Sequence, residues 1–114
     1  MTVRTDFPRQ VREVENLWIP MPDGARLAAR MWLPEDAEAS PVPALFEFLP
    51  YRKSDGTAVR DALRQPYYAG HGYAVLRVDM RGSGDSDGVL WDEYTVQEHD
   101  DAVACIAWIA AQPW

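Results

Sequence analysis

The sequence YAVLRVDMRGSGDSDG occupies residues 73–88 and decides the fold class. An apolar run that starts at Tyr73 ends at Asp79, and a glycine-rich segment over residues 81–88 follows it. A buried strand that runs into a glycine-rich loop is typical of open α/β sheets, which bind ligands at the carboxyl ends of their strands. The stretch therefore predicts a strand over residues 73–79 and a ligand crevice beside residues 81–88.

The glycine-rich segment contains a G-x-S-x-G pattern over residues 84–88, which is the pattern of a nucleophile elbow centred on Ser86. An elbow needs a strand directly before the serine and a helix directly after it, but the predicted strand ends too early and no helix start occurs before Thr95. The flanking Asp85 and Asp87 also disfavour a developing negative charge. We therefore interpret Ser86 as part of a solvated turn.

Upstream of this stretch, residues 11–21 and 26–33 predict an antiparallel hairpin, because Pro22-Asp23-Gly24 between them is a turn signal. Residues 26–33 alternate in polarity, which predicts one buried face and one wetter face. The wetter face would consist of Arg26, Arg30 and Trp32.

Residues 44–49 form a short run that is apolar on both faces, which is typical of a central strand. A helix is expected from Thr57 onward, interrupted by Pro66 and ended by Gly70 and Gly72. Its apolar face would consist of Ala58, Ala62, Leu63, Pro66 and Tyr67.

The best-marked helix begins after Thr95, which forms a capping box with Glu98, and ends at Gln112-Pro113. Residues 102–111 are apolar nearly all round, so this helix is expected to be covered on more than one side. A hairpin followed by strand, helix, strand and helix predicts an α/β fold with parallel central strands. A βαβ repeat would continue with another strand after Trp114, so we expect residues 1–114 to be one domain cut short.

Composition narrows the function classes. A net charge of −7 and a pI near 4.6 argue against nucleic acids or anionic membranes as partners. No apolar run approaches the roughly 20 residues of a membrane span, and the first residues lack the apolar core of a signal peptide. The single Cys105 excludes an internal disulfide and is expected in the core. These features favour a cytoplasmic protein.

The sequence contains no convincing cofactor or metal motif, and we expect neither. A calcium loop around residues 85–88 lacks the acidic ligand at its twelfth position, where Tyr94 stands. A phosphate loop would need a G-x-G-x-x-G pattern or a lysine, and Asp85 and Asp87 would repel the anion. His71 and His99 are expected to be structural or exposed to solvent rather than catalytic.

Five short motifs together resemble the N-terminal part of the CocE/NonD hydrolase family, which contains cocaine esterase, glutaryl acylases and Xaa-Pro dipeptidyl-peptidases. The resemblance covers roughly residues 15–114. The motifs are Met21-Pro22-Asp23-Gly24-x-Arg26-Leu27-Ala28, Pro50-Tyr51-Arg52-Lys53, His71-Gly72-Tyr73-Ala74-Val75, Asp79-x-Arg81-Gly82-x-Gly84-x-Ser86-x-Gly88 and Trp108-Ile109-Ala110-x-Gln112-Pro113-Trp114.

The resemblance implies an α/β-hydrolase domain with a helical cap, a C-terminal β-sandwich domain and a Ser-Asp-His triad. Such a triad acts through an acyl-enzyme on an ester, an acyl-amide or an Xaa-Pro peptide bond. In the family the nucleophile elbow follows shortly after the segment that corresponds to residues 112–114. The resemblance therefore implies that residues 1–114 are the N-terminal portion of this domain, truncated before the elbow and without the triad.

One functional residue transfers by resemblance. Tyr51 stands where family members carry the tyrosine that donates its hydroxyl to the oxyanion hole. Its place just past residues 44–49 agrees with this role, because open α/β sheets keep their sites at the carboxyl ends of strands. The alternative is a tyrosine that packs on the crevice wall with an exposed hydroxyl. The crevice itself would be shaped by Arg81, Gly82, Gly84, Ser86 and Gly88.

Four charged residues near the predicted crevice are expected to support it. Glu47 and Arg77 lie inside apolar strands, so they should meet, or each should bind loop backbone. Asp79 and Arg81 are expected to brace the glycine-rich loop against the loop that carries Tyr51.

Three hypotheses follow from the sequence. The first is a segment of a serine hydrolase that acts on a small-molecule ester, amide or peptide. The second is a non-catalytic α/β module that associates through an exposed edge of its sheet, such as residues 44–49, or through the bare face of the last helix. The third is a small esterase that uses Ser86. The bond cleaved and the oligomeric state, including a possible homo-oligomer, stay open.

Overall fold

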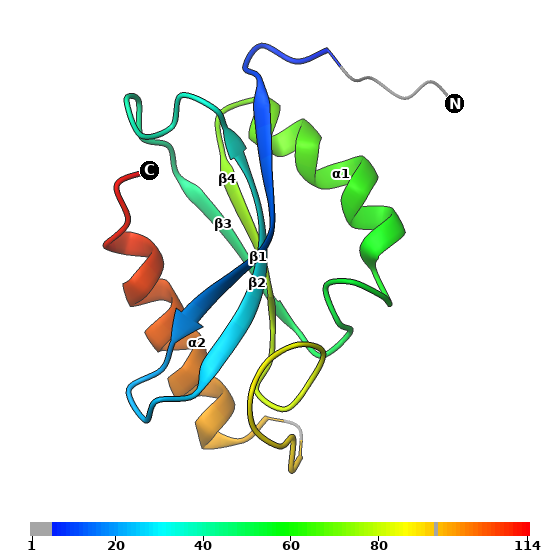
Figure 1. Ribbon diagram of the computed structural model, residues 1–114, viewed down its shortest axis with the longest axis vertical. Coiled ribbons are helices and arrows are strands. Elements are labelled where there is room, and N and C mark those ends of the chain that lie inside the picture. Colours follow the sequence, from blue (N-terminus) through cyan, green and yellow to red (C-terminus); the bar gives the residue numbers. More distant parts are fainter. Residues whose placement is uncertain (1–5, 93) are drawn as a thin grey trace.

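Four strands form one sheet that lies between two helices (Figure 1). This arrangement is seen in a computed structural model that describes residues 6–92 and 94–114. Helix α1 covers one face of the sheet and α2 covers the other, as expected for an α/β fold (Figure 1). The elements are β1 (Val11–Pro20), β2 (Arg26–Pro34), β3 (Ala44–Leu49), α1 (Ala58–Gly70), β4 (Ala74–Asp79) and α2 (Val96–Ala110).

The strand order is β1-β2-β4-β3. β1 pairs with β2 and β2 with β4 in antiparallel fashion, whereas β3 and β4 are parallel. The predicted hairpin and the predicted parallel pair are therefore confirmed. The prediction that residues 44–49 form a central strand is wrong for the described residues, because β3 pairs there with β4 alone. Its apolar pattern on both faces reflects the helix layer on either side of the sheet rather than a strand on each flank.

The face of β2 that the sequence predicts to be wetter is only partly so: Arg26 is exposed as predicted, Arg30 is partly buried and Trp32 is buried. Trp32 is only 1% exposed and packs with Ala69 of α1 and Val75 of β4. Arg30 lies over the Trp32 ring, 4.9 Å from its centroid, and forms an ion pair with Glu13. The alternation along β2 predicts that Trp32 is exposed to solvent, but α1 packs against this face and buries the Trp32 side chain.

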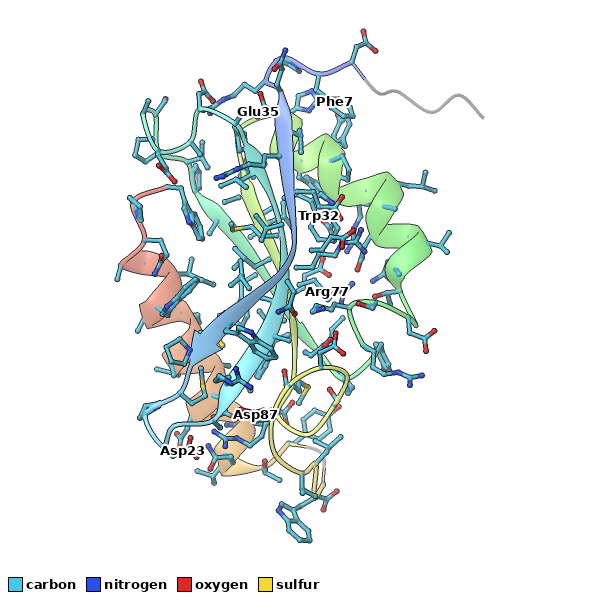
Figure 2. All side chains as sticks on the ribbon, viewed as in Figure 1. Phe7, Asp23, Trp32, Glu35, Arg77 and Asp87 are labelled. Atoms are coloured by element: carbon cyan, nitrogen blue, oxygen red, sulfur yellow. The ribbon has the colours of Figure 1, made fainter. Side chains whose placement is uncertain are left out.

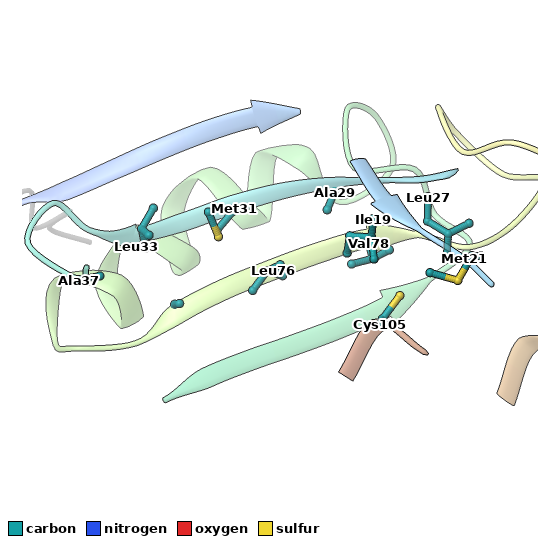
Figure 3. Close-up of a cluster of buried hydrophobic side chains, with 11 residues drawn as sticks. Ile19, Met21, Leu27, Ala29, Met31, Leu33, Ala37, Leu76, Val78 and Cys105 are labelled. Carbon is teal, nitrogen blue, oxygen red and sulfur yellow. The ribbon is translucent and has the colours of Figure 1, made fainter. Parts of the chain in front are cut away.

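The larger core lies on the α2 side of the sheet (Figure 3). Full burial of each large aliphatic side chain there contributes about 1.5–3 kcal/mol. This packing fixes β4, whose carboxyl end leads into the glycine-rich loop. Its buried members include Ile19, Leu27, Met31, Leu33, Leu76, Val78 and Cys105.

Helix α1 buries a different face from the one that the sequence predicts. Leu63 and Tyr67 are 55% and 50% exposed, whereas Asp61, Gln65 and Ala69 are fully buried. The helix also continues through Pro66, where the sequence predicts an interruption, and it ends at Gly70 as predicted. Asp61 turns inward because it meets a buried arginine of β4, Arg77.

Helix α2 begins as predicted, because the Thr95 hydroxyl accepts a hydrogen bond from the Glu98 N–H at 3.2 Å. Only one side of the helix is covered by the described residues, since Val103 and Ile106 are 66% and 55% exposed. Neither helix of the described ranges is long and apolar enough to cross a membrane.

The Cys105 thiol should not react with thiol reagents in the folded protein. Its side chain is fully buried, and burial, followed by the charge of Asp101, raises the pKa of its thiol to about 12. We expect no reaction with a thiol reagent at pH 8 until the chain is unfolded in denaturant. A Cys105→Ala protein that carries Val103→Cys should react at once in the native state. Rapid labelling of native Cys105 would contradict the burial seen here.

Candidate active site

Two loops lie together at one end of the sheet (Figure 1). The Tyr51 loop, residues 50–57, follows β3, and the glycine loop, residues 81–88, follows β4. β3 and β4 are parallel and in register up to the pair Leu49 and Asp79, so both loops leave the sheet at the same edge. This edge is where open α/β sheets bind their ligands.

Tyr51 projects from a tight turn. Its side chain is 59% exposed. The next residue, Arg52, has a φ of 56°, a left-handed conformation that is uncommon for a residue with a side chain. A Cβ atom on Gly56 would lie only 2.2 Å from the Tyr51 carbonyl oxygen, so only glycine fits there. The sequence-predicted donor is thus presented outward by a closely packed and strained turn.

Asp79 joins the two loops, as the sequence predicts. Its carboxylate is buried, and its Oδ1 accepts the Lys53 N–H at 2.6 Å while its Oδ2 accepts the Asp85 N–H at 3.0 Å. The Lys53 Nζ also donates to the Asp85 carboxylate at 2.8 Å. Sequence analysis did not identify Lys53 as part of this brace, although it belongs to the Pro-Tyr-Arg-Lys motif.

Arg81 binds different partners from those predicted. Its guanidinium donates to both oxygens of Asp101 in α2, at 2.8 and 2.9 Å, and contacts Asp23 in the β1–β2 turn at 2.9 Å. These carboxylates, Asp101 first, raise the pKa of Arg81, and Arg81 lowers the pKa of Asp23. The prediction that Arg81 braces the Tyr51 loop is therefore wrong. The guanidinium donates two parallel hydrogen bonds to the single Asp101 carboxylate, which directs Arg81 toward α2.

The glycine loop needs glycine at its closest approaches. Gly82 has a φ of 78°, and a Cβ atom there would lie 2.1 Å from the Leu90 nitrogen. At Gly84, with a φ of 53°, a Cβ atom would lie 2.2 Å from Oδ2 of Asp79. Gly88 packs against the Arg81 side chain.

The Ser86 hydroxyl forms hydrogen bonds to the main chain of two strands. Its Oγ donates to the Asp79 carbonyl oxygen at 2.6 Å and accepts the Ala28 N–H at 2.9 Å. The neighbouring Asp87 accepts the Arg26 N–H at 2.8 Å, and this hydrogen bond is the main cause of a lowered pKa at Asp87. The glycine loop therefore continues to pair with β2 beyond the end of β4. Ser86 links the two strands, because its Oγ binds the backbone of both.

A buried ion cluster lies beside the site on the α1 side of the sheet, where Figure 2 shows Arg77. Glu47 and Arg77 meet as predicted, with Oε2 and Nη2 2.9 Å apart. Asp61 binds Arg77 with both oxygens, at 2.8 and 3.0 Å, and Arg64 contacts Glu47. Sequence analysis missed Asp61, whose only signal is its helical spacing with Gln65 on the face that α1 buries.

A cavity of about 370 Å³ opens between the carboxyl ends of β3 and β4 and the start of α2. Its walls combine apolar side chains with polar ones, and Tyr51 is not among the residues that line it. The polar lining residues are Arg81, Asp92, Thr95, Gln97, Glu98 and Asp101. The apolar side chains allow the cavity to receive an apolar group at the predicted crevice. Apolar lining residues include Phe48, Met80, Val89, Leu90 and Trp91.

His71 lies at the opposite end of the sheet from Tyr51, and His99 lies in the first turn of α2. His71 caps α1 at the amino end of β4, with Nδ1 2.7 Å from the Tyr67 carbonyl oxygen, and His99 is exposed on α2. Among the described residues, no group of three metal-binding side chains comes together.

A profile of the family described as X-Pro dipeptidyl-peptidase (S15 family) matches residues 23–114. Cocaine esterase of a Rhodococcus species is 36% identical over 100 residues, which cover 87% of this chain and 17% of the esterase. A CocE/NonD family hydrolase from Staphylococcus aureus superposes with a TM-score of 0.74 at 23% identity, over 90% of this chain and 21% of the hydrolase. An aminopeptidase from a Thaumarchaeota archaeon superposes with a TM-score of 0.64 at 21% identity, over 99% of this chain and 21% of the aminopeptidase. The chain thus spans about a fifth of the length of these relatives.

Proposed function

Because this chain belongs to the X-Pro dipeptidyl-peptidase (S15) family, we propose that it is part of a serine hydrolase that cleaves an ester, an acyl-amide or an Xaa-Pro peptide bond. The observation that carries this proposal is the exposed Tyr51 at the carboxyl edge of two parallel strands, braced by Asp79 against the glycine loop. The esterase, hydrolase and peptidase names of its relatives support the reaction class.

Tyr51 acts as an oxyanion-hole donor in this proposal. When the serine oxygen attacks the substrate carbonyl carbon, the triad histidine takes the serine proton and the carbonyl π electrons move to the carbonyl oxygen, which becomes an oxyanion. The Tyr51 hydroxyl donates a hydrogen bond to that oxygen and stabilises it. The tetrahedral intermediate then collapses and expels the leaving group, which receives the proton from the histidine, and water hydrolyses the acyl-enzyme that remains. A donor held in place before reaction is effective because it needs no reorganisation when charge develops.

The nucleophile is proposed to lie outside residues 1–114, which would form the N-terminal portion of an α/β-hydrolase domain. Two observations support this assignment. The chain spans about a fifth of its relatives' length, and the Ser86 Oγ already donates to Asp79 and accepts from Ala28. The residues around Ser86, namely Arg81, Gly82, Gly84 and Gly88, shape the crevice instead.

Labelling with a fluorophosphonate probe, read by intact mass, tests this function. We expect one adduct on the protein expressed from its complete reading frame and no adduct on residues 1–114 alone. Ser86→Ala in the complete protein should keep the adduct, because Ser86 is a structural bridge. Loss of the adduct in Ser86→Ala would make Ser86 the nucleophile. Failure of the folded, complete protein to react would overturn the serine-hydrolase proposal.

A second candidate function is a non-catalytic module that associates through the edge of its sheet. The observation that favours it is β3, which pairs with β4 alone among the described residues. The labelling experiment separates the two candidates, because a module of this kind gives no adduct in the complete protein.

A further inference from the structure

Asp79 binds the main chain of both loops at the candidate site. The residue is 1% exposed, and each carboxylate oxygen accepts an N–H from a different loop. Oδ1 accepts from Lys53 at 2.6 Å, and Oδ2 accepts from Asp85 at 3.0 Å. Hydrogen bonds to an ionised carboxylate are stronger than neutral ones, so this residue holds both loops to the end of β4.

The turn that Asp79 holds is the one that presents Tyr51. Lys53, whose N–H binds Asp79, follows Tyr51 by two residues, and Arg52 between them has a φ of 56°. A non-glycine residue in this conformation persists only where its surroundings hold it. On the other side of the turn, Gly56 packs against the Tyr51 carbonyl oxygen. The direction of the Tyr51 side chain therefore depends on the anchor at Lys53.

A second link joins the same loops. The Lys53 side chain is 3% exposed, and its Nζ lies 2.8 Å from Oδ2 of Asp85. The absence of a side chain at Gly84 leaves room for the Asp79 carboxylate, because a Cβ atom at residue 84 would lie 2.2 Å from Oδ2 of Asp79. The Tyr51 loop and the glycine loop thus form one braced unit with Asp79 at its centre.

We propose that Asp79 is a positioning residue for the oxyanion hole. Its carboxylate holds the strained turn after Tyr51 in the geometry that directs the tyrosine hydroxyl at the developing oxyanion. This inference rests on the proposed role of Tyr51. In Asp79→Asn, one oxygen becomes an NH₂ group that faces an N–H donor, so one of the two loops loses its anchor.

A double-mutant cycle with Tyr51→Phe tests the proposal in the complete protein, with a p-nitrophenyl ester as substrate. We expect Asp79→Asn to lower kcat by about 10²-fold, with little change in KM, because small misplacements of a catalytic group have effects of this size. In the Tyr51→Phe background, Asp79→Asn should lower kcat much less, because the hydroxyl that Asp79 positions is already absent. Equal losses in both backgrounds would mean that Asp79 is merely structural and would overturn the proposal.

Asp101→Asn provides the matched control. Asp101 is also a buried carboxylate and binds the glycine loop through Arg81, but it accepts its hydrogen bonds from Arg81 and Gln97 rather than from the Tyr51 loop. Any decrease in kcat caused by Asp101→Asn should therefore be the same with Tyr51 as with Tyr51→Phe.

If thermal melting shows that Asp79→Asn does not fold, Gly84→Ala replaces it, because its Cβ atom would lie 2.2 Å from Oδ2 of Asp79 and displace the carboxylate. The loss of kcat should again depend on Tyr51, and additive losses with Gly84→Ala would overturn the proposal in that case.

The same cycle separates two failures. If Tyr51→Phe alone leaves kcat unchanged, Tyr51 is not an oxyanion donor, and both the proposed role of Tyr51 and this inference are wrong. If Tyr51→Phe lowers kcat but the Asp79 loss is additive, only the inference about Asp79 is wrong.

Discussion

Tyr51→Phe in the complete protein should lower kcat by about 10²- to 10³-fold, which is the usual effect of removing one oxyanion-hole donor. The loss should fall mainly on kcat, because the hydrogen bond strengthens as negative charge develops on the substrate oxygen. The free energy of unfolding should change little, since the Tyr51 side chain is 59% exposed. Steady-state kinetics with a p-nitrophenyl ester, together with thermal melting, measure both quantities.

Tyr73→Phe is the matched control for this prediction. Tyr73 is also partly exposed, at 37%, but it stands at the amino end of β4, the opposite end of the sheet from Tyr51. Removal of its hydroxyl should leave kcat and KM unchanged. An unaltered kcat in Tyr51→Phe would show that the hydroxyl takes no part in the reaction and that Tyr51 is only a wall of the crevice.

Arg77→Met should destabilise the protein by about 3–5 kcal/mol. Arg77 is 1% exposed and its partner Asp61 is fully buried, so the substitution removes the guanidinium that binds both oxygens of this carboxylate. The other arginines near Asp61, Arg60 and Arg64, lie 4.0 and 3.9 Å from its Oδ1 and offset its burial only weakly.

Denaturant unfolding of the 114-residue chain or of the complete protein measures the change. Arg30→Met is the matched control, because its partner Glu13 is 36% exposed at the side chain and pairs near the surface contribute about 0–1 kcal/mol.

The cause of this loss is testable through a second substitution. Arg77→Met combined with Asp61→Leu should recover much of the stability, since an apolar pair in place of a buried ion pair is often neutral or stabilising. If the double variant is less stable than Arg77→Met alone, the unpaired Asp61 carboxylate is not the source of the loss.

The loss in Arg77→Met should depend on pH. Burial acts to raise the pKa of Asp61, but the hydrogen bonds and charge of Arg77 outweigh it and hold the pKa below 3.8. A carboxyl whose pKa is lower in the folded state contributes stability above its unfolded pKa, about 3.9, and that stability disappears as the pH falls through the folded value. In Arg77→Met, burial is no longer offset and raises the pKa of Asp61, so this carboxyl takes up a proton at a higher pH in the variant than in the wild-type protein. The difference in stability between the two proteins should therefore be largest near pH 7 and shrink steadily as the pH falls toward 3. A difference that stays constant from pH 7 to pH 3 would exclude an ionised Asp61 as its source.

Local sequence patterns determined the order of the elements and the place of Tyr51. These patterns act over a few neighbouring residues, so they favour the same strand or helix whatever the rest of the chain does. They are the alternation over residues 26–33, the apolar run that ends at Asp79 and the Thr95 cap. The parallel pairing of β3 and β4 follows from the helix between them, because a βαβ connection returns the chain in the same direction. The sequence also predicts that Ser86 lies outside a nucleophile elbow, since an elbow requires a strand and a helix directly around the serine.

Only the tertiary structure decided which charged groups meet. Asp61 turns inward, Trp32 is buried, Arg81 binds α2 instead of the Tyr51 loop, and β3 lies at the edge of the described sheet. Each of these outcomes depends on groups brought together from distant parts of the chain. Desolvation penalises a charge or a polar group in any apolar setting, but the partner that offsets the penalty is chosen by how the helices lie across the sheet. The sequence by itself therefore determined the scaffold and the position of the candidate donor, whereas the packing of the layers determined the braces that hold it.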